Sequence, residues 1–379
     1  MLWSYIGKRL RRNVGHVLLI VCMIAAVTVL LLGLYQYRGE MEARLDRVYD
    51  EFEIRCTVTE AGGAQTAGLR IKKEIVALFQ PPDGRLLPYV KDIFLIREVM
   101  SSVVRETPIK LYATTDPAAA PQTEGFPIIF YEGYAAEDFA GEEALCVVSE
   151  SMLRKVDENG NITVQLDRYG TVEFRVIGYY DKEESAVFAS WDALNDVFRN
   201  KGVNTMANSM AFTVADNRQL NELKQMLSDF FAPASTVYQG GSKPGLIIDD
   251  ALFRDQVTVL ERGILLLQIV QMLILVLSVG ISFLVAYLNI RARRLELAVM
   301  RSLGTRRAAL YAEVLYEHIL FCLLGVLISA FGVTLFGTVP DRAQWELIGQ
   351  FMLCYLLGVT VAVAQVTSGK IMQTLKGKE

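Results

Sequence analysis

Four runs of residues without Lys, Arg, Asp or Glu constrain this chain more than any other feature of its sequence. Between Arg12 and Arg38 lie 25 such residues, and between Arg262 and Arg291 lie 28. Two further runs of 23 residues extend from His318 to Pro340 and from Leu347 to Gly369. A spanning helix needs roughly 20 apolar residues, so each run is long enough to cross a bilayer. One buried helix of a soluble protein can imitate such a run, but four of them in a chain that is 52% hydrophobic favour a membrane protein. The predicted transmembrane helices are 15–37, 263–290, 308–337 and 347–369.

The distribution of basic residues predicts how these helices are oriented, because Lys and Arg beside a span stay on the cytoplasmic side. Segment 1–14, predicted as a basic entry helix, carries four basic residues and no acid. Segment 291–307 carries six arginines and one acid, and the tail 370–379 carries three lysines and one acid. Both termini are therefore predicted to be cytoplasmic. Residues 38–262 and the short loop 338–346 are left on the outer side.

The large outer segment is acidic. It holds 24 basic and 36 acidic residues, a net charge of about −12. Proteins that bind nucleic acid carry a basic surface to meet the phosphates, so this composition argues against a nucleic-acid partner.

Hydrophobic patterns predict a mixed α/β domain in the outer segment. The predicted strands are 53–59, 145–149, 162–166 and 171–180, and the predicted helices are 71–79, 152–156 and 219–231. The lengths suggest two lobes, one built from 53–115 and 203–235 and the other inserted at 125–200. Residues 116–121 and the glycine-rich stretch 239–245 are predicted as linkers.

Apolar stripes at both ends of the outer segment predict helical stalks at 38–52 and 250–262. The first stripe is Met41, Leu45, Val48 and Phe52, and the second, at intervals of seven, is Leu252, Val259, Leu266 and Leu273. Two such helices entering the domain side by side would form a stalk. Alternatively, both stripes pack on the surface of the domain itself. The predicted fold class is thus four transmembrane α-helices plus a large extracytoplasmic α/β domain of two lobes on helical stalks.

Residues suited to catalysis are scarce. The two histidines are His16, inside a span, and His318, at a membrane end, so histidine-based catalysis and metal binding have no candidates outside the membrane. No phosphate-binding G-x-x-x-x-G-K-[ST] loop occurs, so the chain is predicted to carry no ATPase, cofactor or metal site of its own. Cys56 and Cys146 are the cysteines outside the spans, and the sequence leaves open whether they form a disulfide.

The segment 291–307 between the second and third spans predicts a short amphipathic inner helix. Leu295, Val299, Met300 and Leu303 lie at helical spacing, and Gly304 follows where a helix would end.

This segment resembles the signature of the FtsX-like permease family, the membrane subunits of type VII ABC systems such as macrolide exporters and lipoprotein-release complexes. The family pattern is Arg-x-x-Glu-apolar-small-apolar-apolar-Arg-small-apolar-Gly. It is met here by Arg293, Glu296, Leu297, Ala298, Val299, Met300, Arg301, Ser302, Leu303 and Gly304. Glu317 and Gly325 also match. The layout of one span, a large outer domain and three further spans is similar too, and we expect a stand-alone permease without a fused ATPase before the first span.

The resemblance implies that the inner helix couples the permease to a separate cytoplasmic ABC ATPase, which would bind ATP and Mg²⁺. The implied coupling residues are Arg293, Leu295, Glu296, Val299, Met300, Arg301, Leu303 and Gly304. Glu313 and Glu317, one turn apart, would support them by pairing with arginines of the loop, or they face solvent. The resemblance further implies a bacterial plasma membrane, a second permease as partner, either identical or a related subunit, and an extracytoplasmic protein or peptide as a further partner.

Three other interpretations stay open at this point. The inner helix would lie equally well on anionic lipid, because six arginines suit that surface. Within the same fold, the outer domain would regulate a cell-wall hydrolase instead of exporting a molecule. Outside it, the chain would be a membrane receptor or scaffold without energy coupling.

Overall fold

The computed structural model describes residues 14–81, 83–141, 143–203, 206–233, 243–302, 304–335 and 340–368. The chain divides into two compact units. We call Met1–Asp46 with Val257–Glu379 the membrane unit, and Arg47–Gln256 the sheet unit. The predicted entry helix 1–14, apart from Val14, and the predicted tail 370–379 lie outside the described residues.

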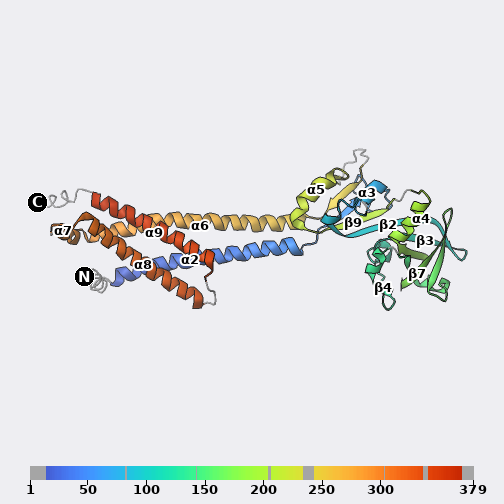
Figure 1. Cartoon of the computed structure of the whole chain (residues 1–379), viewed down its shortest axis with the longest axis horizontal. Helices are drawn as coiled ribbons and strands as arrows, with labels where there is room; N and C mark the ends of the chain where they lie inside the picture. The colour runs from blue at the N-terminus through green and yellow to red at the C-terminus, as the bar shows by residue number, and fades with distance from the viewer. Residues whose placement is uncertain are drawn as a thin grey trace. The chain divides into compact units, whose positions relative to one another are not determined.

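Four helices of the described chain are long and apolar enough to cross a membrane (Figure 1). They are α2 (Val14–Glu51), α6 (Ala251–Ala292), α8 (Arg307–Leu335) and α9 (Arg342–Ser368), with the short α7 (Arg294–Ser302) between α6 and α8. The 38 residues of α2 and the 42 of α6 far exceed the roughly 20 that a bilayer needs, so both helices continue well beyond the predicted spans.

The membrane unit packs around small residues that let helices approach closely. A Cβ added to Gly358 of α9 would lie 2.0 Å from Ser282 Oγ and 2.2 Å from the Val279 carbonyl oxygen of α6. A Cβ added to Gly325 of α8 would lie 2.6 Å from Ile24 Cγ2 of α2. Interfaces of this kind are typical of membrane bundles, in which small residues bring backbones together.

The loop between α8 and α9 is shorter than the predicted 338–346, because α9 already begins at Arg342. The backbone N–H of Gln344 donates to Asp341 Oδ1 at 2.7 Å, and the Asp341 N–H donates back to Gln344 Oε1 at 3.1 Å. This reciprocal pair is a capping box, which starts the helix before its apolar run begins.

Helices α2 and α6 continue into the segments 38–52 and 250–262 that were predicted as stalks, but the second apolar stripe does not face inward. Met41 of the first stripe is half-buried and contacts α6, where a Cβ on Gly263 would lie 2.6 Å from its Cε atom. The second stripe is exposed, with exposed fractions of 68% for Val259, 60% for Leu266 and 55% for Leu273. Gly263 has no side chain, so Met41 can pack closely against this face of α6. This face is not the one that carries the second stripe.

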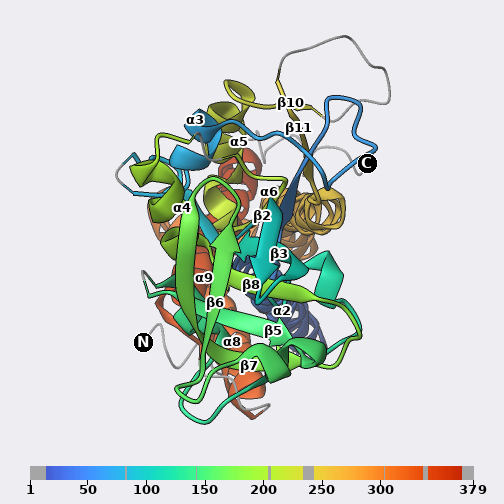
Figure 2. The ribbon, with the colours of Figure 1, turned by 90° about the vertical axis from the view of Figure 1, so that its right-hand side faces the viewer.

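The sheet unit is built on one continuous sheet of eleven strands (Figure 2). The strands are β1 (Arg55–Thr59), β2 (Val90–Val104), β3 (Thr107–Thr114), β4 (Ile128–Phe130), β5 (Leu145–Ser149), β6 (Asn161–Leu166), β7 (Gly170–Tyr180), β8 (Ala186–Ser190), β9 (Ser209–Val214), β10 (Ala232–Pro233) and β11 (Gly245–Ile248). Three α-helices and five 3₁₀ helices accompany the strands within the described part of this unit. They are α3 (Lys73–Ala77), α4 (Trp191–Asn200), α5 (Leu220–Ser228), η1 (Leu87–Tyr89), η2 (Pro121–Thr123), η3 (Ala136–Ala140), η4 (Glu150–Lys155) and η5 (Asn217–Gln219).

Strands from the two predicted lobes share this sheet. Its order is β10-β11-β1-β9-β2-β3-β8-β5-β7-β4, and β6 pairs with both β2 and β7. The parallel pairing of β3 with β8, from Lys110↔Ala186 to Thr114↔Ser190, joins the predicted first lobe to the predicted inserted one. The residues 53–115 and 203–235 thus form one side of a shared sheet with 125–200, and the unit is not divided into two independent bodies.

The predicted glycine-rich linker 239–245 is replaced at its described end by a strand. Gly245 opens β11 and pairs with Thr59 of β1. A Cβ there would lie 2.5 Å from Thr59 Oγ1 and 2.6 Å from the Glu60 carbonyl oxygen. Glycine at this position serves close strand packing, and not the flexibility of a linker.

Candidate functional site

The inner helix α7 begins after a break that immediately follows α6. The Arg293 N–H donates to the Ile290 carbonyl at 3.1 Å, and the Arg293 carbonyl accepts from the Leu297 N–H at 3.1 Å, so the chain turns without losing its backbone hydrogen bonds. The helix ends before Gly304, whose φ of 92° is in the left-handed region. Glycine adopts this conformation without the steric cost that a Cβ would bring, which explains why the helix stops there.

Arg293 anchors the start of α7 to the transmembrane helix α8. Its Nη1 atom donates to Glu317 Oε2 at 2.6 Å, and its Nε atom lies 3.7 Å from Glu296 Oε2. The side chains of Arg293 and Glu317 are 14% and 8% exposed, so this is a largely buried ion pair. A buried charge that loses its partner is costly, and the pair therefore fixes the start of α7 against α8. Glu313, one turn before Glu317, is half-buried on α8.

Some of the described side chains of α7 pack against the membrane unit, and others are exposed. Leu297 packs against the core of the membrane unit. Val299 is 59% exposed, and the Glu296 side chain is 41% exposed. Met300 is half-buried, and its carbonyl accepts from the Thr305 N–H at 3.2 Å. The helix is thus held on one side and offers an apolar and an acidic side chain on the other.

Three of the predicted coupling residues cannot be placed in this arrangement. Leu303 lies outside the described residues, and the side chains of Leu295 and Arg301 are outside the described part as well. Arg293, Glu296 and Glu317 are brought together by the ion pairs.

One buried polar pair, next to the Arg293–Glu317 ion pair, was not predicted from the sequence. His318, which follows Glu317 and is fully buried, lies with Nδ1 3.0 Å from the Tyr355 hydroxyl of α9. The Tyr311 hydroxyl donates to the Thr360 carbonyl at 3.2 Å, which also joins α8 to α9. A histidine and a tyrosine inside apolar runs were the available signal, but their spacing in the sequence does not reveal the pairing.

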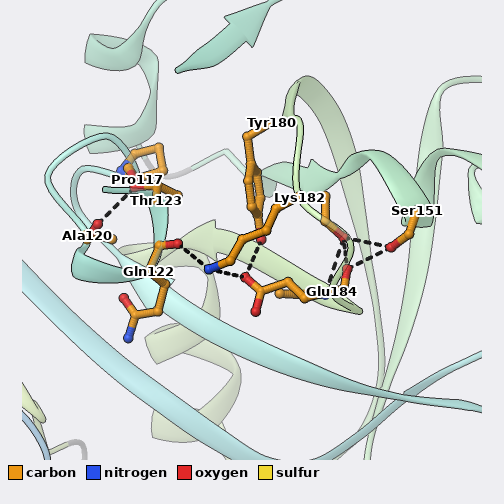
Figure 3. A network of polar contacts seen from close by, with 10 residues as sticks. Pro117, Ala120, Gln122, Thr123, Ser151, Tyr180, Lys182 and Glu184 are labelled. Carbon is orange, nitrogen blue, oxygen red and sulfur yellow. Dashed lines mark hydrogen bonds and ion pairs between the residues drawn. The ribbon is translucent and has the colours of Figure 1, made fainter. Parts of the chain in front are cut away.

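In the sheet unit, a polar network surrounds Glu184 (Figure 3). Lys182 Nζ lies 3.3 Å from Glu184 Oε1 and donates to the Gln122 carbonyl at 2.8 Å. The Tyr180 hydroxyl donates to the same carboxylate at 3.1 Å, and Ser151 donates to the Glu184 carbonyl at 2.7 Å. Burial, with the nearby Glu184 charge, raises the pKa of Tyr180 well above its usual range. These contacts join neighbouring loops of the sheet unit, so we interpret the network as structural.

The two cysteines of the sheet unit are free and buried, so the disulfide that the sequence left open is not formed. Burial raises the pKa of the Cys56 thiol to about 12 and raises that of Cys146 further. Among the described residues, no group of three or more His, Cys, Asp or Glu side chains is arranged to hold a metal ion.

These features define a multi-pass plasma-membrane protein with a short helix between its second and third spans and a large α/β domain. Residues 269–366 match the family model described as FtsX-like permease C-terminal. This part of the chain, from within α6 to near the end of α9, is similar to the C-terminal part of FtsX-like permeases, and the family resemblance of the inner segment is confirmed.

Comparison with solved structures gives distant likenesses. The periplasmic region of MacB from Actinobacillus actinomycetemcomitans is similar at 14% identity, with 55% of this chain and 94% of that chain covered and a TM-score of 0.31. The extracellular domain of the noncanonic ABC-type transporter YknZ from Gram-positive bacteria is similar at 14% identity, with 52% and 99% covered and a TM-score of 0.30. No curated protein matches the chain.

Proposed function

We propose that this chain is the permease subunit of an ABC transporter and that α7 receives movement from a separate cytoplasmic ATPase. ATP and Mg²⁺ would be bound by that ATPase, and the chain itself would carry no catalytic residue. The movement would pass through the long helices α2 and α6 to the sheet unit, which would then extrude a substrate from the outer leaflet or the outer space.

The observation that carries the proposal is the buried Arg293–Glu317 ion pair at the start of α7, together with the exposed Val299 on the same helix. The pair ties α7 to α8 at 2.6 Å, while Val299 remains 59% exposed. A helix that is rigidly anchored and presents an apolar side chain is suited to transmit force from a protein partner. A helix that rests on lipid has no comparable need for a buried ionic anchor, so the arrangement favours docking over the lipid-surface interpretation.

A second permease is the proposed partner within the membrane. Val259, Leu266 and Leu273 form an exposed line on α6 at intervals of seven, the spacing of a helix–helix seam. Leu266 and Leu273 fall in the charge-free run and would be satisfied by lipid, but Val259 precedes Arg262 and would face water. A partner helix along this line would cover it, and the line is the same on every copy, which favours a symmetric pair.

The proposed docking is tested by purifying the chain with its neighbouring ATPase in nanodiscs and comparing Glu296→Ala and Val299→Asp with the wild type. Val299→Asp places a charge in the contact and is expected to weaken association about tenfold or more, with loss of permease-stimulated ATP hydrolysis. The matched control is Ile247→Asp, which makes the same kind of change at a residue of β11 that is 41% exposed. If both α7 variants kept full association and full hydrolysis, the proposal would fail.

The same preparation separates the rival functions. A transporter shows ATP hydrolysis that its substrate stimulates, whereas a regulator of a cell-wall hydrolase has an outer protein partner whose activity needs ATP inside. A receptor or scaffold co-purifies with no ATPase, and its inner loop tolerates scrambling.

A further inference from the structure

The sheet unit holds the last turn of α2 through side chains of η5. Asn217, which is 6% exposed, donates from Nδ2 to the Tyr49 carbonyl at 2.9 Å and to the Phe52 carbonyl at 2.6 Å. The carbonyls at a helix C-terminus have no partner within the helix, so these bonds complete the end of α2. The next residue, Arg218, pairs with Asp50 and lies with its guanidinium 5.2 Å from the centre of the Tyr49 ring.

Helix α5, which directly follows η5, holds the first turn of α6. Asp250, with a side chain only 5% exposed, directly precedes α6 and accepts the Arg254 N–H on its carbonyl at 2.9 Å. Lys224 of α5 pairs with the Asp250 carboxylate, and Arg254 Nε lies 3.2 Å from the same Oδ2 atom. An acidic group at a helix N-terminus is favoured by the helix dipole, and burial makes its two cationic partners necessary.

Aromatic side chains connect the two helix ends to each other inside the sheet unit. The Phe253 ring of α6 lies 5.5 Å from Tyr49 and 5.6 Å from Phe52, centre to centre. Phe253 is 4% exposed, so the contact is part of the core and not a surface pairing. Residues 217–224 therefore bind both the end of α2 and the start of α6, and these two helix ends also pack against each other.

We propose that Asn217, Arg218 and Lys224 form a clamp that fixes the direction in which α2 and α6 leave the sheet unit. The inference rests on the proposed function: movement of the two helices reaches the sheet unit through this clamp, which keeps the helix ends from pivoting freely. The clamp residues are positioning residues, since they touch neither a substrate nor a nucleotide. Strands β1 and β11 would move first, because β1 follows α2 within four residues and the Asp249 backbone N–H donates to the Arg55 carbonyl at 3.0 Å.

The test uses the full chain with its ATPase in nanodiscs and measures hydrogen–deuterium exchange with and without ATP, Mg²⁺ and vanadate. The wild type is expected to show a nucleotide-dependent change in peptides that cover β1 and β11. In Lys224→Gln, which removes the charge and keeps most of the length, more than half of that change is expected to be lost while ATP hydrolysis continues. Lys201→Gln, an exposed position after α4, is the matched control and is expected to keep the full change.

Each outcome is decisive for one of the two proposals. If the wild type shows no nucleotide-dependent change in β1 and β11 despite hydrolysis, the transmission proposed above is wrong and the clamp has nothing to transmit. If the wild type responds and Lys224→Gln responds equally, the clamp is wrong and the transmission stands. Arg218→Gln, at a more exposed ion pair, gives the same reading should Lys224→Gln fail to fold. A uniform rise in exchange of the core strand β5 with an intact nucleotide response would show a merely structural role and would also overturn the clamp.

Discussion

The Arg293–Glu317 ion pair makes the sharpest prediction about the stability of the membrane unit. Glu317→Leu removes the carboxylate and leaves the Arg293 guanidinium, with a side chain only 14% exposed, without its partner at 2.6 Å. Removing one member of a buried pair costs about 3–5 kcal/mol. The cost here is expected at the lower end, about 3 kcal/mol, because Glu296 remains 3.7 Å from Arg293 and shares its charge.

The assay is a double-mutant cycle on the free energy of unfolding, measured by denaturant titration in mixed micelles. Arg293→Met alone is expected to cost a similar amount, because it removes the cation that lies 2.6 Å from the buried Glu317 carboxylate. The double variant Arg293→Met, Glu317→Leu is expected to lie within about 1 kcal/mol of the wild type, because two apolar side chains replace the pair. The reasoning is refuted if Glu317→Leu costs less than about 1 kcal/mol, or if the double variant loses the sum of the two single losses.

Three further predictions test other parts of the structure. Gly358→Ala is expected to disrupt α6–α9 packing, because its Cβ would lie 2.2 Å from the Val279 carbonyl oxygen. The control is Gly349→Ala on the same helix, whose Cβ meets nothing within 4 Å. Thermal unfolding compares the two variants, and equal unfolding midpoints would contradict the packing. Gly304→Ala is expected to destabilise the end of α7 by about 1–2 kcal/mol, because a Cβ is strained at a φ of 92°. The variant is also expected to bind the ATPase more weakly, which titration of the ATPase measures. Unchanged affinity would show that docking does not depend on where α7 ends. Burial raises the pKa of the Cys56 thiol to about 12, so the thiol is expected to stay protonated and its alkylation rate is expected not to rise between pH 7 and 9. An alkylation rate that rises with pH, as for an exposed thiol, would refute the burial.

The membrane half was predictable from the sequence because its constraints are local. A charge-free run must form a helix in a bilayer, since every backbone polar group has to be satisfied within the segment. The strands predicted at 171–180 and 145–149 are present in the structure as β7 and β5. Their alternating or continuous apolar patterns are signals that a strand carries in its own residues.

The sheet of the outer segment was harder to predict because its pairing is not local. The long strand β2 was missed, although it pairs with β3, β6 and β9 and joins the two predicted lobes. Its residues Val90–Val104 change pattern at register shifts, which interrupts the alternation that identifies a strand.

The candidate site was predictable in its composition but not in its geometry. The family signature singled out Arg293, Glu296 and Glu317, yet the sequence did not decide between pairing and solvent exposure for Glu317. That choice depends on how α6 turns into α7, which a single break at Arg293 determines. The clamp residue Asn217 was not singled out, because an asparagine that caps a helix 165 residues away leaves no local pattern.

The central claim is that α7 is gripped by a nucleotide-driven partner, and photo-cross-linking in living cells tests it most directly. A photoreactive phenylalanine analogue replaces Val299, and in a second strain it replaces Leu327, a residue of α8 that is 61% exposed. The account predicts a covalent product of the chain with the ATPase from position 299 and none from position 327. It is contradicted if position 299 yields only lipid adducts while the ATPase remains bound to the chain elsewhere.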